Sequence, residues 1–73
     1  MKYITSDPEI LSGKPVIAGT RIPVARVVYL LKDGFTLEGI HKQYPHVPIK
    51  ILGGVVDELI MKIDKDFYES KVS

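Results

Sequence analysis

The strongest pattern in the chain is an apolar stripe at helical spacing in its last third. Apolar residues recur there every three or four positions, which places them on one face of a helix. Charged residues occupy many of the positions between them, as expected for an amphipathic helix with one buried side. The pattern therefore predicts a long third helix whose stripe consists of Leu52, Val55, Val56, Leu59, Ile60, Ile63 and Phe67.

Two shorter helical patterns precede this stripe. The first predicts a helix over residues 24–33, and Gly34 is placed to end it in the left-handed conformation of a C′ residue. The second begins after Thr36, a good N-cap residue, and stops before Pro45, which cannot continue a helix. The predicted apolar faces are Val24, Val27, Val28 and Leu31 in the first helix and Leu37, Ile40 and Tyr44 in the second.

Two adjacent glycines, Gly53 and Gly54, stand inside the third helical pattern. Each costs about 1 kcal/mol relative to alanine in a helix interior, so the pair either breaks the helix or has a reason to be there. One interpretation is close packing of another helix or backbone segment against them. The other is a bare helix surface that lies against DNA or a protein partner. The sequence leaves these interpretations open.

A β-hairpin is predicted ahead of the helices. Between residues 13 and 24, two β-branched runs are interrupted by a Gly-Thr-Arg turn, in which Gly19 supplies the positive φ of a tight reversal. Pro15 and Pro23 limit both arms to edge positions. Because a two-stranded hairpin is marginal in water, we expect it to pair with residues 2–5 or with a second copy. The predicted turn residues are Gly13, Gly19 and Thr20.

The length of 73 residues allows one domain. We divide it into a β element over 1–23, a three-helix bundle over 24–67 and a tail over 68–73, a mainly α fold. A core of this size contributes little to the stability of the fold, and the chain has no Cys that could add a disulfide. His41 and His46 are five residues apart and do not share a helix face, so neither a metal nor a cofactor is predicted. A homodimer is therefore expected.

Charge and hydropathy narrow the class of partner and the compartment. The net charge is +1, with seven Lys or Arg against four Asp or Glu in residues 1–50 and three against five in 51–73. This mild asymmetry permits DNA contact without demanding it. No signal peptide and no membrane-spanning run is recognisable, so we expect a soluble cytoplasmic protein. The candidate DNA contacts are Arg21, Arg26, Lys42 and Lys50, with residues 46–54 as the start of a recognition helix.

Enzyme chemistry finds little support in the sequence. A hydrolase needs a nucleophile with a base and an oxyanion site, yet Cys is absent and the few serines lie in apparent turns or in the tail. The two histidines are interpreted as exposed residues rather than as catalysts. We therefore predict no catalytic residue.

Several short motifs together resemble the DUF433 family. They are DPEI at residues 7–10, GKPVI at 13–17 and GTRIPV at 19–24, followed by Gly34, Thr36, Ile40 and Tyr44-Pro45. The resemblance covers roughly residues 3–60. It implies a small helix-turn-helix domain, similar to homeodomain-like or winged-helix folds, with an N-terminal β element. It also implies an association with antitoxins of the VapB type, whose partners are PIN-like ribonuclease toxins.

The sequence and this resemblance together predict a non-enzymatic, antitoxin-like homodimer that binds a PIN-like nuclease and its own operator DNA. The alternative is a dimeric protein-interaction module that does not bind DNA. Candidate partner-binding residues are Ile63, Phe67 and Tyr68, because large apolar anchors dominate interfaces. For Ile60 and Ile63, burial in the core or in the dimer interface is an open alternative.

Overall fold

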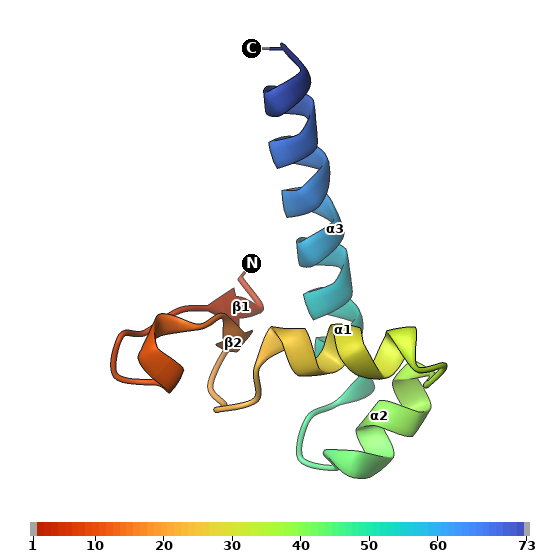
Figure 1. Cartoon of the computed structure of the whole chain (residues 1–73). Helices are drawn as coiled ribbons and strands as arrows, with labels where there is room; N and C mark the ends of the chain where they lie inside the picture. Colours follow the sequence, from red (N-terminus) through yellow and green to blue (C-terminus); the bar gives the residue numbers. More distant parts are fainter. Residues whose placement is uncertain (1, 73) are drawn as a thin grey trace.

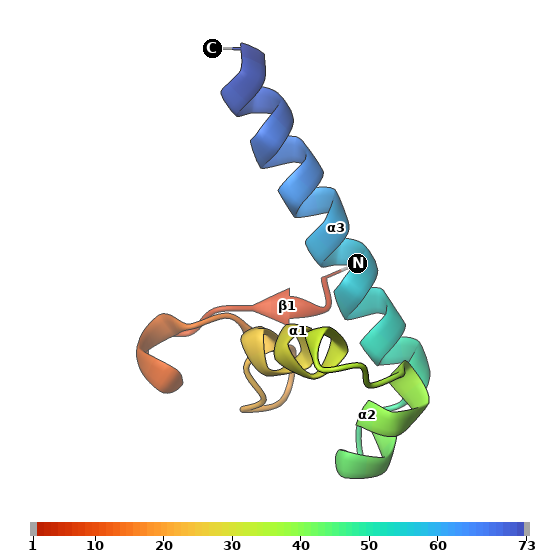
Figure 2. The ribbon, with the colours of Figure 1, turned by 45° about the vertical axis from the view of Figure 1, so that its right-hand side comes forward.

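Three helices follow a short two-stranded sheet, and the last helix is by far the longest. The computed structural model describes the backbone of residues 2–72 and the side chains of residues 2–66. Figures 1 and 2 show the sheet, the first two helices and the start of the third gathered into one body, from which the third helix projects. The elements are β1 (Ile4–Thr5), the 3₁₀ turn η1 (Leu11–Gly13), β2 (Val16–Ile17), α1 (Val24–Lys32), α2 (Leu37–Gln43) and α3 (Ile49–Val72).

This arrangement confirms a mainly α fold with a short antiparallel strand pair at its N-terminus. The pair joins β1 to β2, with Ile4 opposite Ile17 and Thr5 opposite Val16. Of the two partners expected for the GKPVI arm, the segment at residues 2–5 is therefore the one observed. The second predicted arm is reduced to an isolated bridge between Val16 and Pro23, because a proline has no N–H to continue a ladder.

The predicted reversal at Gly19 is present. Gly19 has φ +78°, and the Thr20 hydroxyl closes the turn on both sides. The hydroxyl donates to the Ile17 carbonyl at 2.8 Å and accepts from the Ile22 N–H at 3.0 Å. Gly13 also has a positive φ, of +85°, and is the last residue of η1. The three predicted turn residues thus lie in turns.

Helix α1 ends as predicted, but its buried face differs from the prediction. Gly34 has φ +97°, and the N–H groups of Gly34 and Phe35 donate to the carbonyls of Leu31 and Leu30, which is a Schellman motif. Val28, expected inside, is 42% exposed. Because α1 packs against β2 and α2, the row that faces the core is Val24, Val27 and Leu30.

Helix α2 and the turn after it are fixed by side-chain hydrogen bonds. The Thr36 hydroxyl caps α2 by accepting from the Gly39 N–H at 3.1 Å, as predicted. His41 Nδ1 lies 2.7 Å from the Val47 carbonyl and must donate, since a carbonyl can only accept. On the apolar face, Ile40 is fully buried and Tyr44 packs against the core. The turn between α2 and α3 is thereby tied to α2.

Helix α3 runs unbroken through both glycines, and an aromatic ring packs on one of them. A Cβ atom built on Gly54 would lie 2.6 Å from Cε2 of Tyr3, far inside contact distance. The Tyr3 N–H donates to the carboxylate of Glu58, one turn further along α3. Close packing is therefore observed at Gly54 alone, and the packed group is the Tyr3 ring rather than the helix or backbone segment that was expected; at Gly53 only Leu37 Cδ1 comes within 4 Å of the added Cβ. The N-terminal strand is in this way attached to the middle of α3.

We predict that Gly19→Val destabilises the protein by about 1–3 kcal/mol, because a β-branched residue is strained at positive φ. No other group lies within 4 Å of a Cβ built at Gly19, so steric contact adds nothing to this strain. Urea unfolding followed by circular dichroism measures the change in the free energy of unfolding. A midpoint equal to that of the native chain would contradict the assignment of strain to the backbone.

The two neighbouring glycines of α3 should respond in opposite ways to alanine. Gly53→Ala should raise the free energy of unfolding by about 1 kcal/mol through helix propensity, since its nearest neighbour, Leu37 Cδ1, is 3.9 Å from the added Cβ. Gly54→Ala should lower it by about 1–3 kcal/mol, because the methyl group displaces the Tyr3 ring. The pair is compared by the same urea titration. Equal gains in both variants would show that the Tyr3 ring is not held on α3.

Candidate functional site

The apolar stripe of α3 extends beyond the body that covers it. Leu52 and Val55 are buried in the core, and Leu59 is half-buried against it. Further along the same face, Ile60 is 56% and Ile63 59% exposed. Figures 1 and 2 show why, since from this level onward α3 has no other element beside it. The stripe predicted from the sequence is present from Leu52 to Ile63, and its part from Ile60 onward has no covering surface in the described residues; its last member, Phe67, lies outside the described side chains.

Met61 is also exposed but belongs to a different face. It is 71% exposed and follows Leu59 by two residues, which turns it about 200° around the helix. Ile63 follows Leu59 by four residues and therefore continues the buried row. The projecting part of α3 thus has an apolar side with Ile63 and an opposite side with Met61.

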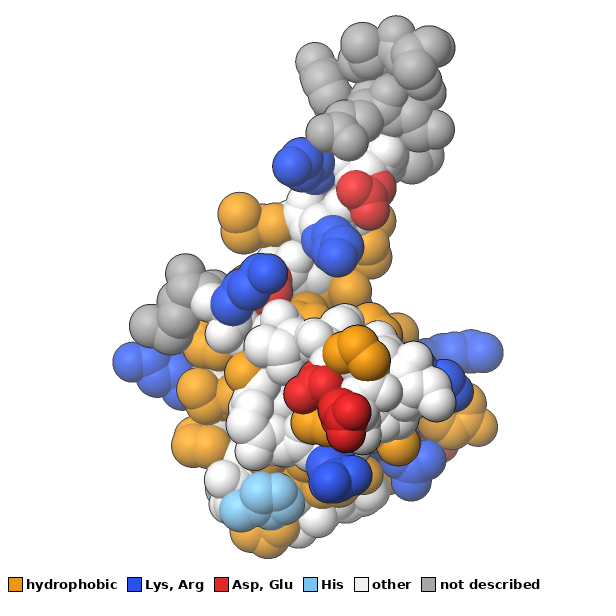
Figure 3. All heavy atoms as spheres, turned by 90° about the vertical axis from the view of Figure 1, so that its left-hand side faces the viewer, with side chains coloured by type: hydrophobic (Ala, Val, Ile, Leu, Met, Phe, Trp, Pro, Cys, Tyr) orange, Lys and Arg blue, Asp and Glu red, His pale blue; other side chains and the backbone are white. Residues whose placement is uncertain are grey.

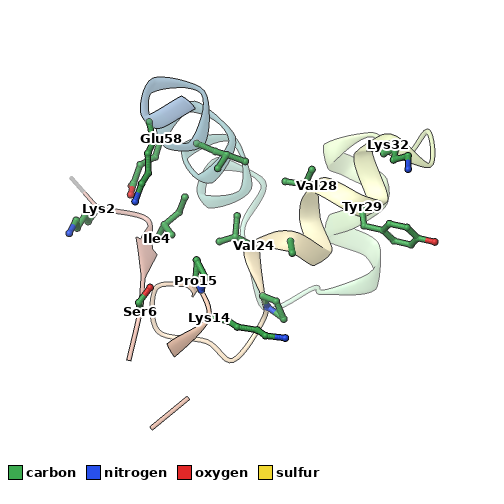
Figure 4. Close-up of a pocket in the computed structure, with 14 residues that line it drawn as sticks. Lys2, Ile4, Ser6, Lys14, Pro15, Val24, Val28, Tyr29, Lys32 and Glu58 are labelled. Atoms are coloured by element: carbon green, nitrogen blue, oxygen red, sulfur yellow. The ribbon is translucent and has the colours of Figure 1, made fainter. Parts of the chain in front are cut away.

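A groove of about 740 Å³ lies where α3 leaves the body. It opens between β1, α1 and α3, and Figure 4 shows Ile4, Val24 and Val28 pointing into it. Leu59 lines it from α3. The outward position of Val28, which contradicts the sequence-based prediction, is what supplies the α1 wall of this groove. Its floor is apolar and open to solvent.

The charges around the groove are mostly positive. Four exposed lysines line it, and Figure 4 places Lys2 and Lys32 at its two ends. The one carboxylate of its lining, Glu58, accepts from the backbone N–H of Tyr3. Apolar floor and cationic rim together suit a ligand that carries apolar groups flanked by negative charge. The four lysines are Lys2, Lys14, Lys32 and Lys62.

Sequence reasoning missed most of this groove. Its lysines are up to 60 positions apart in the sequence, so no local pattern connects them. The one available signal was the surplus of lysine in the first 50 residues, which does not tell where the side chains meet.

The four candidate DNA contacts are exposed but do not form one cluster. Arg21 follows Gly19 and Thr20, which border a hollow with Pro48 and Ile51 at the start of α3, close in sequence to Lys50. Lys42 lies in the last turn of α2, just ahead of this region. Arg26 lines a separate hollow beside η1. Three of the four are therefore carried by segments around the α2–α3 turn.

The distribution of basic side chains on one face of the molecule can be followed in Figure 3. On the face shown in Figure 3, Lys and Arg side chains are scattered among apolar and acidic ones. That face has no continuous basic patch of the kind that dedicated nucleic-acid binders present. Among the residues whose side chains are described, no three His, Asp or Glu side chains are grouped to hold a metal ion.

The candidate partner-binding residues are placed only in part. Ile63 lies on the uncovered stripe of α3. Phe67 and Tyr68 lie outside the described side chains, although the helix backbone passes through both positions. Helix α3 itself continues to Val72, further than the pattern that ended at Phe67.

Comparison with known proteins identifies the family. The model of the family described as "Protein of unknown function (DUF433)" matches residues 4–52. The chain belongs to the DUF433 family. The matched residues of this DUF433 protein include β1, β2, α1, α2 and the first turn of α3, and they stop before Glu58, Leu59 and Lys62 of the groove.

One curated protein also resembles the chain. It is "Uncharacterized protein y4eO" from Sinorhizobium fredii (strain NBRC 101917 / NGR234), which is 39% identical over 44 residues. The aligned segment is 60% of this chain and 20% of that protein, so the DUF433 chain spans about a fifth of its relative. No solved structure matches. Within residues 2–72, no helix of this DUF433 protein is both long and apolar enough to cross a bilayer.

Proposed function

We propose that this DUF433 protein is a non-enzymatic, cytoplasmic regulator of the antitoxin type, which acts as a homodimer and binds a PIN-like ribonuclease. The observation that carries the proposal is the uncovered stripe of α3. Ile60 and Ile63 stand in solvent at helical spacing on a part of α3 that no other described element touches. A short isolated helix is marginal in water, so this part of α3 gains stability from a partner surface.

The division into a body and a projecting helix supports a protein partner. A helix that presents apolar anchors at i, i+3 and i+7 binds by lying in an apolar groove of its partner. Ile60, Ile63 and Phe67 have that spacing, and Tyr68 adds a second aromatic residue. Aromatic anchors of this kind contribute much of the affinity in protein interfaces. The class of partner, a PIN-like ribonuclease, follows from the association with VapB-type antitoxins that the resemblance to the DUF433 family implies.

DNA is the second proposed ligand, and one observation favours it. Arg21, Lys42 and Lys50 are exposed on segments around the α2–α3 turn, which is the place of the recognition elements in helix-turn-helix proteins. The scattered charges of Figure 3 favour instead the alternative function, a dimeric interaction module without DNA binding. The two functions differ in one measurable property, the binding of operator DNA.

A chain that ends at Asp66 tests the nuclease proposal. This truncation removes Phe67 and Tyr68 and leaves every residue of the described core in place. We expect it to fold and dimerise like the full chain but to lose inhibition of a PIN-like ribonuclease, itself expected to be encoded beside its gene, so that at least about tenfold more of the truncated chain is required. Retained inhibition would remove residues 67–73 from the interface, and failure to fold would assign them to the core.

DNA binding is tested by gel shift with the sequence upstream of the chain's own gene. We expect binding at about 50 mM salt that weakens steeply by about 200 mM, as counterion release requires. Lys42→Ala and Lys50→Ala should each reduce affinity equally on all sequences, because phosphate contacts carry no base information. Lys65→Ala, on the projecting part of α3, is the matched control and should bind as the native chain does. Absence of a shift at low salt would favour the interaction module.

A further inference from the structure

We propose that the groove beside α1 is filled by the projecting part of α3 from a second copy of this chain, and that the second copy's groove is filled in return. The segment that enters is residues 60–66, with Ile63 set between Val28 and Leu59. This proposal rests on the homodimer of the proposed function and specifies how the two copies meet. It assigns Ile60 and Ile63 to the dimer, which leaves Phe67 and Tyr68 as the anchors for the nuclease. It uses two surfaces of one chain that are each incomplete alone.

The apolar surfaces match in kind. The groove offers Ile4, Val24 and Val28 on one side and Leu59 on the other, open to solvent along its length. The projecting helix offers Ile60 and Ile63 with nothing packed on them in the described part of the chain. Burying both together removes from water two apolar surfaces that a monomer leaves exposed. Helix-in-groove packing is the geometry that does this.

The position of the groove makes the exchange reciprocal. Leu59 and Lys62 of α3 line it, so the groove begins where the same helix starts to project. A second α3 that runs antiparallel to the first therefore passes directly over the groove. The entering residues 60–66 make about 10 Å of helix, which is two turns of contact. A two-fold axis between the helices gives each copy the same contact, which closes the assembly as a dimer.

The charges select this occupant. The groove is lined by Lys2, Lys14, Lys32 and Lys62, and its one carboxylate already accepts from Tyr3. On the entering helix, Asp64 and Asp66 lie on either side of Ile63, about 100° and 60° around the helix from it. Lys62 lies about 100° from Ile63 on the side of Asp66, and Lys65 lies about 200° from it, so the charge nearest to Ile63 around the helix is the Asp66 carboxylate. An apolar row with a carboxylate on each side thus meets an apolar floor with a lysine at each end. A phosphate backbone would satisfy the lysines but leave the apolar floor uncovered.

The first test compares two equally exposed apolar residues. Val28 and Leu11 are both 42% exposed, but Val28 lines this groove and Leu11 lines the separate hollow beside η1. We expect light scattering to give a dimer for the native chain and for Leu11→Glu, and a folded monomer for Val28→Glu. On α3, Ile63→Lys should be monomeric and Met61→Lys dimeric. Circular dichroism confirms that each variant keeps its helices.

The second test mixes two variants that each lose the dimer contact, so that opposite charges can restore the contact between them. In an equimolar mixture of Val28→Glu and Ile63→Lys, one groove pairs glutamate with lysine and the other keeps the native valine with isoleucine. We therefore expect native mass spectrometry to show a heterodimer in the mixture, at least tenfold more abundant than either homodimer. A mixture of Val28→Glu with Met61→Lys should give no such gain.

The outcomes separate this proposal from the proposed function. A native chain that is monomeric at about 100 μM, a Val28→Glu variant that remains dimeric, or a mixture that gives no heterodimer would each overturn the groove assignment. Inhibition of the nuclease by the chain that ends at Asp66 concerns the antitoxin proposal alone, since that chain keeps both the groove and residues 60–66. Loss of inhibition there with an intact dimer supports both proposals.

Discussion

The apolar stripe of α3 is longer than the body that folds against it, and the rest of the structure follows from this mismatch. The first half of the stripe, with Leu52 and Val55, organises the core, because β2, α1 and α2 contribute the other buried residues of the same cluster. Tyr3 fixes the N-terminal strand to α3 by resting its ring on Gly54 and donating its N–H to Glu58. The second half of the stripe has no covering element in the described residues, so its burial depends on another molecule.

The rotation of α1 about its axis, which points Val28 away from the core, places a binding surface next to the uncovered part of α3. The apolar spacing of α1 alone would place Val28 in the core. Instead Val24, Val27 and Leu30 face inward, and Val28 lines the groove at the point where α3 begins to project. The uncovered helix and the uncovered groove are therefore neighbours, which is the condition for two copies to exchange helices. The lysines around the groove and the carboxylates beside Ile63 attract each other, which favours the exchange of helices over the binding of a positively charged ligand.

Much of the fold could be predicted from the sequence because its signals are local. Gly19, Gly34 and Thr36 each act through their own backbone or a hydrogen bond within a few residues, and each does so as predicted. The choice of strand partner depends on a pairing between Ile4 and Ile17, and the packing on Gly54 depends on the still more distant Tyr3, and the sequence left both open. The groove could not be predicted at all, because its lysines meet only after folding. Val28 was placed wrongly because two rows of α1 fit the same apolar spacing.

The family match and the candidate site occupy different parts of the chain. Residues 4–52 match the DUF433 model and form most of the body. The uncovered stripe, together with Glu58, Leu59 and Lys62 of the groove, lies after the matched residues. Membership of the family therefore accounts for the body, while the surface proposed to bind a partner lies on the part of α3 beyond the matched residues.

Hydrogen exchange across α3 at several protein concentrations tests most directly whether another copy covers the stripe. We predict that amides of residues 60–66 are protected at about 100 μM and lose that protection on dilution to about 0.1 μM. Amides of α1 should keep the same protection throughout, since the body folds within one chain. Residues 60–66 that exchange at the same rate at every concentration would contradict a partner-covered stripe.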